Sequence, residues 1–516
     1  MDASRDAARD FEARVSVSPE PTIEQVPGAA TRSAPTIRGL LRSVSLTSLA
    51  ILLAKGLGLI SLPIIARSIG VTEYGFWDTL MMTFVVGALI ARLGMDQATC
   101  HFVGLAQDAN TARTYATTGV RFVVVGSLVT AAAFIALSPA LDTALFSGRL
   151  PMATFMVAAG LLICEALLLF VNDLLRFTDR LRWYLVGTTG VALVFVLALV
   201  SLEWSGSLTI TTALAGYLVA EAVTLGVLVI VARGHLFFRA DRRLLRPMLR
   251  FGFPTVFSAS GFLVMSVADR FILAAYRLYD DLGLYAMAYR LSFILAVVLD
   301  AFGAMFMPYV YGLYRADPNL VAERLRLIGR WYVFISCMLG LAIVALAEPL
   351  AVLIGGPDFE GAALAVPLLT AAALANAYGN RFCVGIDLRR RTSYRAVIAG
   401  AAAGINMALN FVLIPPYGMM GAAVATFCAY LAASIVHMAV SEPLLPVSHP
   451  LVGAHLAFCV VAGATIPLLP AAPTVALYVY LVLAVPAIAA LLRIRLHETR
   501  ALSAVLLSSR ALRRLG

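Results

Sequence analysis

The sequence predicts an all-α polytopic membrane protein with about fourteen transmembrane helices, and three observations support this. Hydrophobic residues make up 61% of the 516 residues and charged residues only 13%, whereas soluble domains are on average about half apolar and a quarter charged. Many apolar segments reach the roughly 20 residues that a membrane-spanning helix needs. Of the 39 Lys and Arg residues, 30 fall in the tails and the even-numbered connections, and 3 fall in the odd-numbered connections.

This asymmetry predicts the orientation of the chain. Short connections rich in Lys and Arg stay in the cytoplasm, so we expect both termini there. The net charge of +10 follows from the same topology and favours anionic membrane lipids as neighbours rather than nucleic acid. The remaining six basic residues lie inside apolar segments, where a charge is costly and usually functional.

The predicted helices follow the apolar segments in chain order. They occupy residues 42–66, 75–100, 115–137, 152–175, 183–203, 208–232, 251–275, 283–312, 328–347, 361–386, 395–414, 418–440, 450–469 and 473–492. Residues 1–38 mix Arg, Asp, Glu, Ser and Pro without an apolar core. This composition predicts a disordered cytoplasmic tail and not a cleaved signal peptide.

Two short motifs indicate an internal duplication of six helices. Glu73-Tyr74-Gly75-Phe76-Trp77 opens the second segment and Asp281-Leu282-Gly283-Leu284-Tyr285 opens the eighth, with their glycines 208 residues apart (283 − 75). Leu-Arg pairs that precede the fifth and eleventh segments lie 213 residues apart (389 − 176). An even number of helices in each repeat makes the repeats parallel, related by an axis along the membrane normal.

The duplication predicts two pseudo-symmetric six-helix lobes with two extra helices at the C-terminal end. The predicted domains are a tail (1–38), an N-lobe of helices one to six (39–233), a basic cytoplasmic linker (234–250), a C-lobe of helices seven to twelve (251–440), helices thirteen and fourteen (441–493) and a basic cytoplasmic tail (494–516).

Three motifs in order resemble a known family. They are Ile69-Gly70-Val71-Thr72-Glu73-Tyr74-Gly75, then Phe251-Gly252-Phe253-Pro254 followed by Asp269-Arg270, and Leu413-Ile414-Pro415-Pro416-Tyr417-Gly418. Together they resemble the polysaccharide flippases of the multidrug/oligosaccharidyl-lipid/polysaccharide exporter superfamily, over about residues 40–440. One departure is Arg92, which stands where members of that family often carry an acidic or small polar residue; His101 stands where a basic residue often follows.

The resemblance implies two lobes around a central cavity that faces each side of the membrane in turn. It implies a bacterial cytoplasmic (inner) membrane location and an undecaprenyl-pyrophosphate-linked oligosaccharide as substrate, flipped from the inner to the outer leaflet for surface polysaccharide export. A polysaccharide polymerase and export machinery would then be partners. The sequence contains no Walker motif, metal-ligand cluster or nucleophile arrangement, so we predict no catalytic residue, metal or cofactor.

Charged residues inside the predicted helices are the candidate site. We expect Lys55, Arg92, Arg290 and Arg381 to line the cavity, because guanidinium and ammonium groups bind phosphate oxygens. The alternative is internal pairing, since buried ions need partners. Lys55 would then neutralise Glu165 or Glu221, and Arg92 would meet Asp300, to which the repeat offset relates it (92 + 208).

The other candidates are acidic and amide side chains. We expect Glu165 and Glu221 to couple transport to H⁺ or Na⁺. Asp269 and Arg270 are expected to form a structural or gating pair, and Asp300 to act as a gating residue. Asn376 and Asn380 lie four residues apart on one helical face, where they would bind sugar hydroxyls or join two helices. The same spacing in Asn406 and Asn410 favours a helix contact.

Several functions remain open at this point. The alternatives to an oligosaccharide flippase are a peptidoglycan precursor (lipid II) flippase, a cation-coupled drug exporter, and a non-transporting membrane subunit of a polysaccharide synthesis complex. An arginine-lined cavity argues against cationic drugs. No predicted extracytoplasmic connection exceeds about fifteen residues by these boundaries, which argues against a membrane glycosyltransferase.

Overall fold

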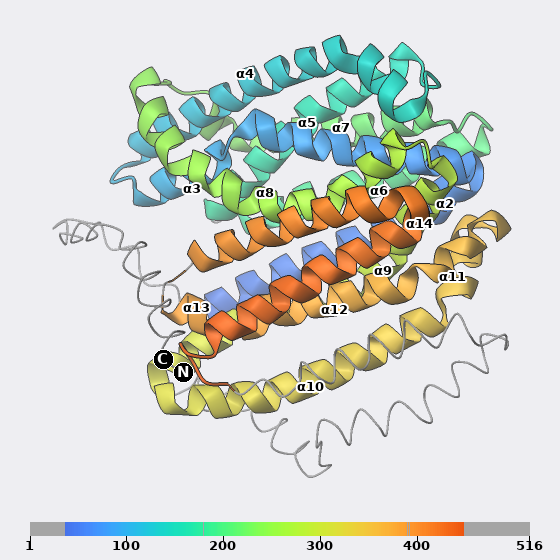
Figure 1. Ribbon diagram of the computed structural model, residues 1–516. Helices are drawn as coiled ribbons and strands as arrows, with labels where there is room; N and C mark the ends of the chain where they lie inside the picture. The colour runs from blue at the N-terminus through green and yellow to red at the C-terminus, as the bar shows by residue number, and fades with distance from the viewer. Residues whose placement is uncertain (1–36, 179, 390, 392, 448–516) are drawn as a thin grey trace. The chain divides into compact units, whose positions relative to one another are not determined.

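The computed structural model describes residues 37–178, 180–389, 391 and 393–447, and within them every regular element is helical (Figure 1). The α-helices are α2 (Ile37–Arg92), α3 (Met95–Leu105), α4 (Ala109–Leu141), α5 (Met152–Phe177), α6 (Leu181–Trp204), α7 (Ile210–Leu236), α8 (Leu245–Ala275), α9 (Tyr279–Ala316), α10 (Pro318–Ala345), α11 (Ala347–Gly355), α12 (Val366–Phe382), α13 (Val384–Leu388) and α14 (Ser393–Ser441). A π turn (Asp142–Phe146) and 3-10 turns (Arg242–Leu244 and Pro357–Leu364) connect some of them.

Seven of the described helices are long and apolar enough to cross a membrane, or eight if the bent pair at α12 is one span. Helices α8 and α9, of 31 and 38 residues, are also long; some of their side chains lie outside the described residues, and the two helices are not counted among the seven. Helix α2 holds 56 residues, about 84 Å at 1.5 Å per residue, far more than the roughly 30 Å of hydrocarbon. It therefore consists of two spans.

Glycines with positive φ divide α2 and α14 into such pairs. Gly70 has φ 79° in α2 and Gly418 has φ 54° in α14, a conformation that glycine adopts without a steric penalty. Figure 1 shows the two halves of α14 side by side. These four helix halves correspond to the first, second, eleventh and twelfth predicted segments. The two family motifs that contain Gly70 and Gly418 are therefore turns between helices.

The predicted all-α membrane fold is confirmed, with three differences in detail. The second predicted segment, 75–100, is not continuous: α2 ends at Arg92, Leu93 and Gly94 have φ 43° and 73°, and α3 begins at Met95. The tenth, 361–386, is bent by 51° between the 3-10 turn and α12. The connection between the lobes is Phe237–Leu244 rather than 234–250, because helices extend past the apolar window that hydropathy detects.

Other predicted parts lie outside the described residues. The structure describes neither residues 1–36 nor 448–516. The predicted N-terminal tail, the helices predicted at 450–469 and 473–492 and the C-terminal tail belong almost wholly to these two ranges.

Helix starts reproduce the repeat that the sequence motifs indicated. Helix α4 begins at Ala109 and α10 at Pro318, 209 residues later (318 − 109). Helix α6 begins at Leu181 and the first half of α14 at Ser393, 212 residues later (393 − 181). In the N-lobe, α2, α4, α5, α6 and α7 pack together; in the C-lobe, α9 packs on α10 and α12, and α14 packs on α8 and α12.

The two repeats meet where their glycine motifs coincide. A Cβ on Gly75 would lie 2.8 Å from the backbone nitrogen of Gly283, so these helices approach too closely for a side chain. Thr72 Oγ1 donates to Asp280 Oδ1 at 2.5 Å, and the two residues are 208 positions apart. Residues that are equivalent by the repeat offset therefore touch across the pseudo-symmetry axis. We term this end of the molecule, which carries the turns at Gly70 and Gly418, the outer end. It is predicted to be extracytoplasmic.

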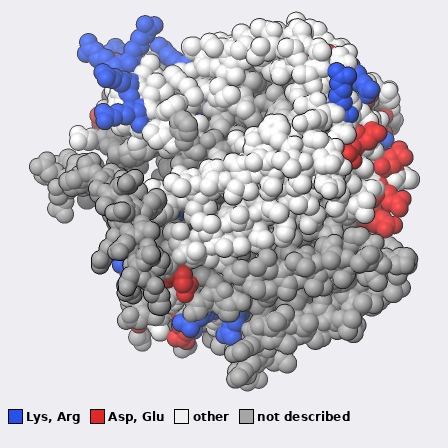
Figure 2. Space-filling view, viewed as in Figure 1, with Lys and Arg blue, Asp and Glu red and all other residues white. Residues whose placement is uncertain are grey.

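The lobes also meet at the opposite end, termed the inner end. A Cβ on Gly252 of α8 would collide with the backbone of Gly94, and the His101 ring of α3 stacks on Phe251 with 4.1 Å between centroids. Figure 2 shows one face of the molecule with its Lys, Arg, Asp and Glu gathered toward two opposite sides and a broad band between them without such residues. This band is the expected surface for lipid tails.

Substitution of Gly283 by Val is expected to separate the lobes at the outer end, because the added side chain would collide with the Val71 carbonyl and such overpacking costs about 1–3 kcal/mol. Cysteines placed at positions 72 and 280, with the native cysteines removed, would report this as slower cross-linking by a short thiol reagent. Gly312→Val is the control on the same helix, since it enters open space. Equal cross-linking in both variants would contradict a close contact at Gly283.

Candidate functional site

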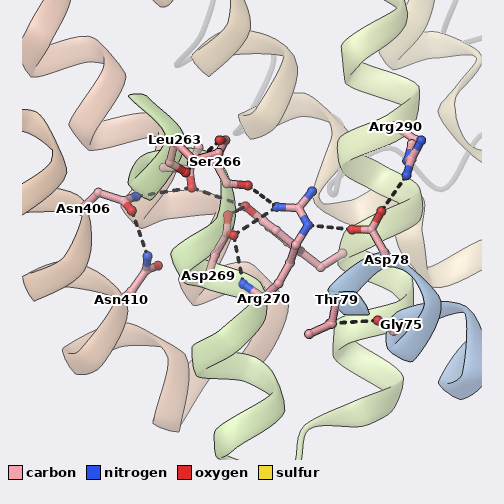
Figure 3. A network of polar contacts seen from close by, with 12 residues as sticks. Gly75, Asp78, Thr79, Leu263, Ser266, Asp269, Arg270, Arg290, Asn406 and Asn410 are labelled. Atoms are coloured by element: carbon pink, nitrogen blue, oxygen red, sulfur yellow. Dashed lines mark hydrogen bonds and ion pairs between the residues drawn. The ribbon is translucent and has the colours of Figure 1, made fainter. Parts of the chain in front are cut away.

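An ion-pair network joins the two lobes near the outer end (Figure 3). Arg270 Nε on α8 contacts Asp78 Oδ2 at 2.6 Å, and a terminal nitrogen of Arg290 on α9 contacts Asp78 Oδ1 at 2.8 Å. Arg270 also contacts Asp269 Oδ1 at 3.0 Å. Two carboxylates thus meet two guanidinium groups, and the network has no net charge when all four groups are ionised.

Burial distinguishes the two arginines. The side chains of Arg270 and Asp78 are 1% and 0% exposed, whereas that of Arg290 is 37% exposed. The guanidinium carbon of Arg270 lies 4.3 Å from the Tyr289 ring centroid, a cation–π distance, and a terminal nitrogen donates to the Ser266 carbonyl at 2.7 Å. The Arg270 side chain is therefore buried among its described partners, whereas part of the Arg290 side chain is exposed.

Local sequence explains why these groups meet. The glycine turn at Gly70 starts the second half of α2, and the close approach at Gly75 brings that half against α9. Asp78 follows Gly75 by three positions, close to one helical turn, so it faces the same neighbour. Asp269 and Arg270 lie toward the end of α8, which ends at Ala275. The predicted pairing of Asp269 with Arg270 is present, and Asp78 is the anion that completes it.

Hydrogen bonds extend the network into the C-lobe. The Tyr285 hydroxyl donates to Asp269 Oδ2 and lies 3.3 Å from Thr426 Oγ1. Asn406 on α14 lies at 3.5 Å from the same Thr426 hydroxyl and accepts from Asn410 at 3.1 Å. Asn406 and Asn410 are fully buried, and here they join the halves of α14 to this network, a helix contact as favoured from the sequence.

A cavity of about 350 Å³ lies against this network. Its walls come from α2, α5, α6 and α7, and Arg290 reaches it from α9 of the C-lobe. The exposed part of the Arg290 side chain faces this cavity. Its lining includes a second cation and several rings or amides: Lys55, Tyr74, Trp77, Asn172, Phe195 and Tyr217.

Aromatic side chains make one wall of the cavity. Trp77 stacks on Phe195 with 6.1 Å between ring centroids, and Phe195 meets Tyr217 edge to face at 4.8 Å. Lys55 Nζ lies 4.8 Å from the ring centroid of Phe293, which belongs to the C-lobe helix α9. The cavity therefore offers two cations and flat ring surfaces, which suit an anionic group attached to a partly apolar sugar.

Of the predicted substrate-binding residues, Lys55 and Arg290 line this cavity. Arg92 does not: it forms an ion pair with Asp96 at 2.5 Å where α2 ends. The side chain of Asp300, its predicted partner on α9, lies outside the described side chains. The predicted gate between Arg92 and Asp300 therefore stays a prediction.

Three further predicted residues lie on α12 in the C-lobe. Asn380 donates to Asn376 at 2.6 Å, and Arg381 donates to the Ala377 carbonyl at 3.2 Å. None of the three is among the residues that line the cavity. Their contact with a substrate stays a prediction.

The predicted coupling residues Glu165 and Glu221 lie on the adjacent helices α5 and α7 of the N-lobe. Glu221 is fully buried and Glu165 is partly buried. The two carboxyl groups are neighbours. They are brought together as a pair, separate from the Asp78 network.

Sequence reasoning missed Asp78 and the two tyrosines beside the network, Tyr74 and Tyr285. Asp78 lies only a few positions inside the second predicted segment, where a carboxylate is readily interpreted as a residue at the membrane interface. A signal was present: it follows Glu73-Tyr74-Gly75, the motif that marks the repeat. A carboxylate one turn after a close-contact glycine faces the other repeat, and opposite it the second repeat supplies Arg290.

Comparison with known proteins agrees with this architecture. The chain superposes on the lipid II flippase MurJ in an inward closed conformation with a TM-score of 0.64 and 13% identity, over 84% of this chain and 97% of that one. An inward-facing multidrug resistance MATE family transporter of the MOP superfamily gives a TM-score of 0.58 and 16% identity, over 80% and 96%. A MOP superfamily transporter from Pyrococcus furiosus, described with a binding pocket of reversed polarity, gives 0.53 and 14%, over 78% and 95%.

These likenesses establish the fold, which is that of the MOP superfamily transporters. No curated protein matches the sequence. A family model described as polysaccharide biosynthesis protein matches residues 40–311, more than half of the 516 residues. The chain therefore belongs to the polysaccharide biosynthesis protein family.

Proposed function

We propose that the protein is a flippase that moves an undecaprenyl-pyrophosphate-linked oligosaccharide from the inner to the outer leaflet of a bacterial cytoplasmic membrane. The observation that carries the proposal is the cavity in which Arg290 and Lys55 face an aromatic wall. The two cations suit a pyrophosphate, because guanidinium forks bind phosphate oxygens in pairs. The rings suit the apolar faces of the sugar that follows.

The size of the cavity indicates how the substrate would be held. Its volume of about 350 Å³ is at the lower end of the roughly 300–1,000 Å³ of small-molecule pockets. It has room for a pyrophosphate and the adjoining sugar, and the polyprenyl chain would remain in the lipid. Passage of a longer oligosaccharide would require the lobes to separate, first at one end and then at the other.

Arg290 links the cavity to the contact between the lobes. Its guanidinium already binds one oxygen of Asp78 from the N-lobe, and it presents its open side to the cavity. A pyrophosphate in the cavity would compete with Asp78 for this cation. Substrate binding would then loosen one of the ion pairs that hold the lobes together, while Arg270 would continue to neutralise Asp78.

Family membership supports a role in surface polysaccharide synthesis, in which a polymerase would use the flipped unit on the outer face. A lipid II flippase is the second candidate, because its substrate carries the same lipid pyrophosphate. The cations in the cavity argue against an exporter of cationic drugs. A subunit without transport activity would have no use for an open, charged cavity.

Deletion of the gene is expected to abolish one surface polysaccharide and to leave its lipid-linked repeat unit in the inner leaflet. The check is analysis of extracted lipid-linked sugars together with surface glycan, with a plasmid-borne wild-type copy as the control. Arrested cell-wall synthesis would identify lipid II as the substrate instead. Intact glycans with altered drug sensitivity would contradict both flippase assignments.

A further inference from the structure

The N-lobe contains a buried carboxyl group that the ion-pair network does not use. Glu221 on α7 is 0% exposed, and among the described residues neither of its two carboxyl oxygens has a hydrogen-bond partner. The group that acts on it from the neighbouring helix α5 is a second carboxyl, Glu165. Two acidic groups thus share one site inside the membrane part of the protein.

Charge balance at this site is unfavourable if both groups are ionised. A buried carboxylate needs donors or a cation, and without them its burial costs several kcal/mol. No described Lys, Arg or His side chain forms an ion pair with Glu221. Lys55 of α2 lies over the Phe293 ring of α9.

The other titratable or charged groups around the pair can be named helix by helix. Helix α5 contributes Cys164 beside Glu165, and α7 itself contributes Tyr217. Helix α6 has charged residues only near its ends, at Arg182 and Glu203, and Arg121 of α4 is exposed. None of these supplies a buried positive charge next to Glu221.

We propose that Glu165 and Glu221 form a proton-binding site. A proton adds to one carboxylate oxygen of Glu221 and forms an O–H bond, and this hydroxyl donates a hydrogen bond to a carboxylate oxygen of Glu165. The charge of the pair changes from −2 to −1. Release of the proton to water reverses the step, and no other bond forms or breaks.

The surrounding backbone favours H⁺ over Na⁺ as the occupant. Transporters usually coordinate Na⁺ with carbonyl oxygens of unwound helices, but α5 and α7 are continuous through Glu165 and Glu221. Among the described residues no group of three or more His, Cys, Asp or Glu side chains is arranged to hold a metal ion. Two carboxyl groups can share one proton without a further ligand, whereas Na⁺ would need additional oxygens.

Tyr217 connects this site to the cavity. It stands one helical turn before Glu221, lines the cavity, and interacts electrostatically with both glutamates and with Arg290. Loss of the proton would add a negative charge behind the cavity wall and weaken the binding of an anionic headgroup there. This coupling rests on the proposed function, whereas the proton site itself does not.

Infrared difference spectroscopy of the purified protein tests the site without any transport. The wild type should show the C=O band of a protonated carboxylic acid that shifts on deuteration, and Glu221→Gln, which keeps the size of the side chain, should lose it. Glu165→Gln should shift the band, because the acceptor changes. Glu348→Gln, on the exposed surface of α11, should leave it unchanged.

Identical spectra of the wild type and Glu221→Gln at every pH at which both are folded would overturn the proton site. Loss of the band on addition of Na⁺ at constant pH would overturn it in favour of a metal cation. In proteoliposomes, an imposed pH gradient should change the flipping rate of the wild type, and Glu221→Gln should lose this response completely. A full response in Glu221→Gln would overturn the coupling, and wild-type protein without flipping activity would instead contradict the proposed function.

Discussion

Substitution of Asp78 by Asn is expected to lower the free energy of unfolding by about 3–5 kcal/mol, because removal of one partner from a buried ion pair leaves an uncompensated charge. Asp78 is fully buried and neutralises Arg270 and Arg290 from two sides. Its loss would leave the network with a net positive charge between the lobes. Denaturant titration of the detergent-solubilised protein measures the effect.

Substitution of the partner residue Arg270 completes the test. Arg270→Gln should cost a similar amount, because Asp269 and Asp78 then lack their shared cation. The double variant restores a neutral network, so its loss should be smaller than the sum of the two single losses, as expected for residues in contact. Asp358→Asn, at an exposed position, should change stability by no more than about 0.5 kcal/mol. Additive losses in the double variant would argue against a coupled network.

Replacement of Arg290 by Ala is expected to reduce flipping by about 10- to 100-fold while the protein remains folded. A hydrogen bond to a charged group contributes about 1.5–3 kcal/mol, and each 1.4 kcal/mol corresponds to a factor of ten. Stability should suffer less than in Asp78→Asn, because Asp78 keeps Arg270 at 2.6 Å and the Arg290 side chain is partly exposed to the cavity.

Two further variants separate charge from geometry. Arg290→Lys keeps the charge but not the planar fork that binds two phosphate oxygens, so it should recover only part of the activity. Arg121→Ala removes an arginine from an exposed position on α4 and should flip at the wild-type rate. If Arg290→Ala flipped normally at a normal protein level, the cavity would not be the binding site for the headgroup.

Much of the fold could be predicted because lipid imposes a length and a composition on each span. The first twelve apolar segments correspond to helices or helix halves, and the repeat offset of 208 between Gly75 and Gly283 recurs as a direct contact between Thr72 and Asp280. Hydropathy does not reveal where a helix breaks. The division at Leu93 and Gly94 depends on close packing against Gly252, which no local pattern shows.

The site was less predictable because its contacts join distant parts of the chain. Asp78 and Arg270 are separated by 192 positions, and only the packing of α2 against α8 and α9 brings them together. Charge type and depth did indicate Lys55 and Arg290, since cations in apolar segments need a cavity or a partner. The same reasoning indicated Arg92, whose observed contact is with Asp96, four residues further along the chain.

Flipping by purified protein tests the central claim most directly. Proteoliposomes would carry an undecaprenyl-pyrophosphate-linked oligosaccharide in both leaflets, and a membrane-impermeant glycosidase would digest the sugars exposed outside. With wild-type protein the whole pool should become accessible, and with Arg290→Ala the inner half should become accessible about 10- to 100-fold more slowly. If wild-type protein left the inner half protected, or made it accessible no faster than Arg290→Ala does, a cationic cavity that carries the lipid-linked sugar across the membrane would be contradicted.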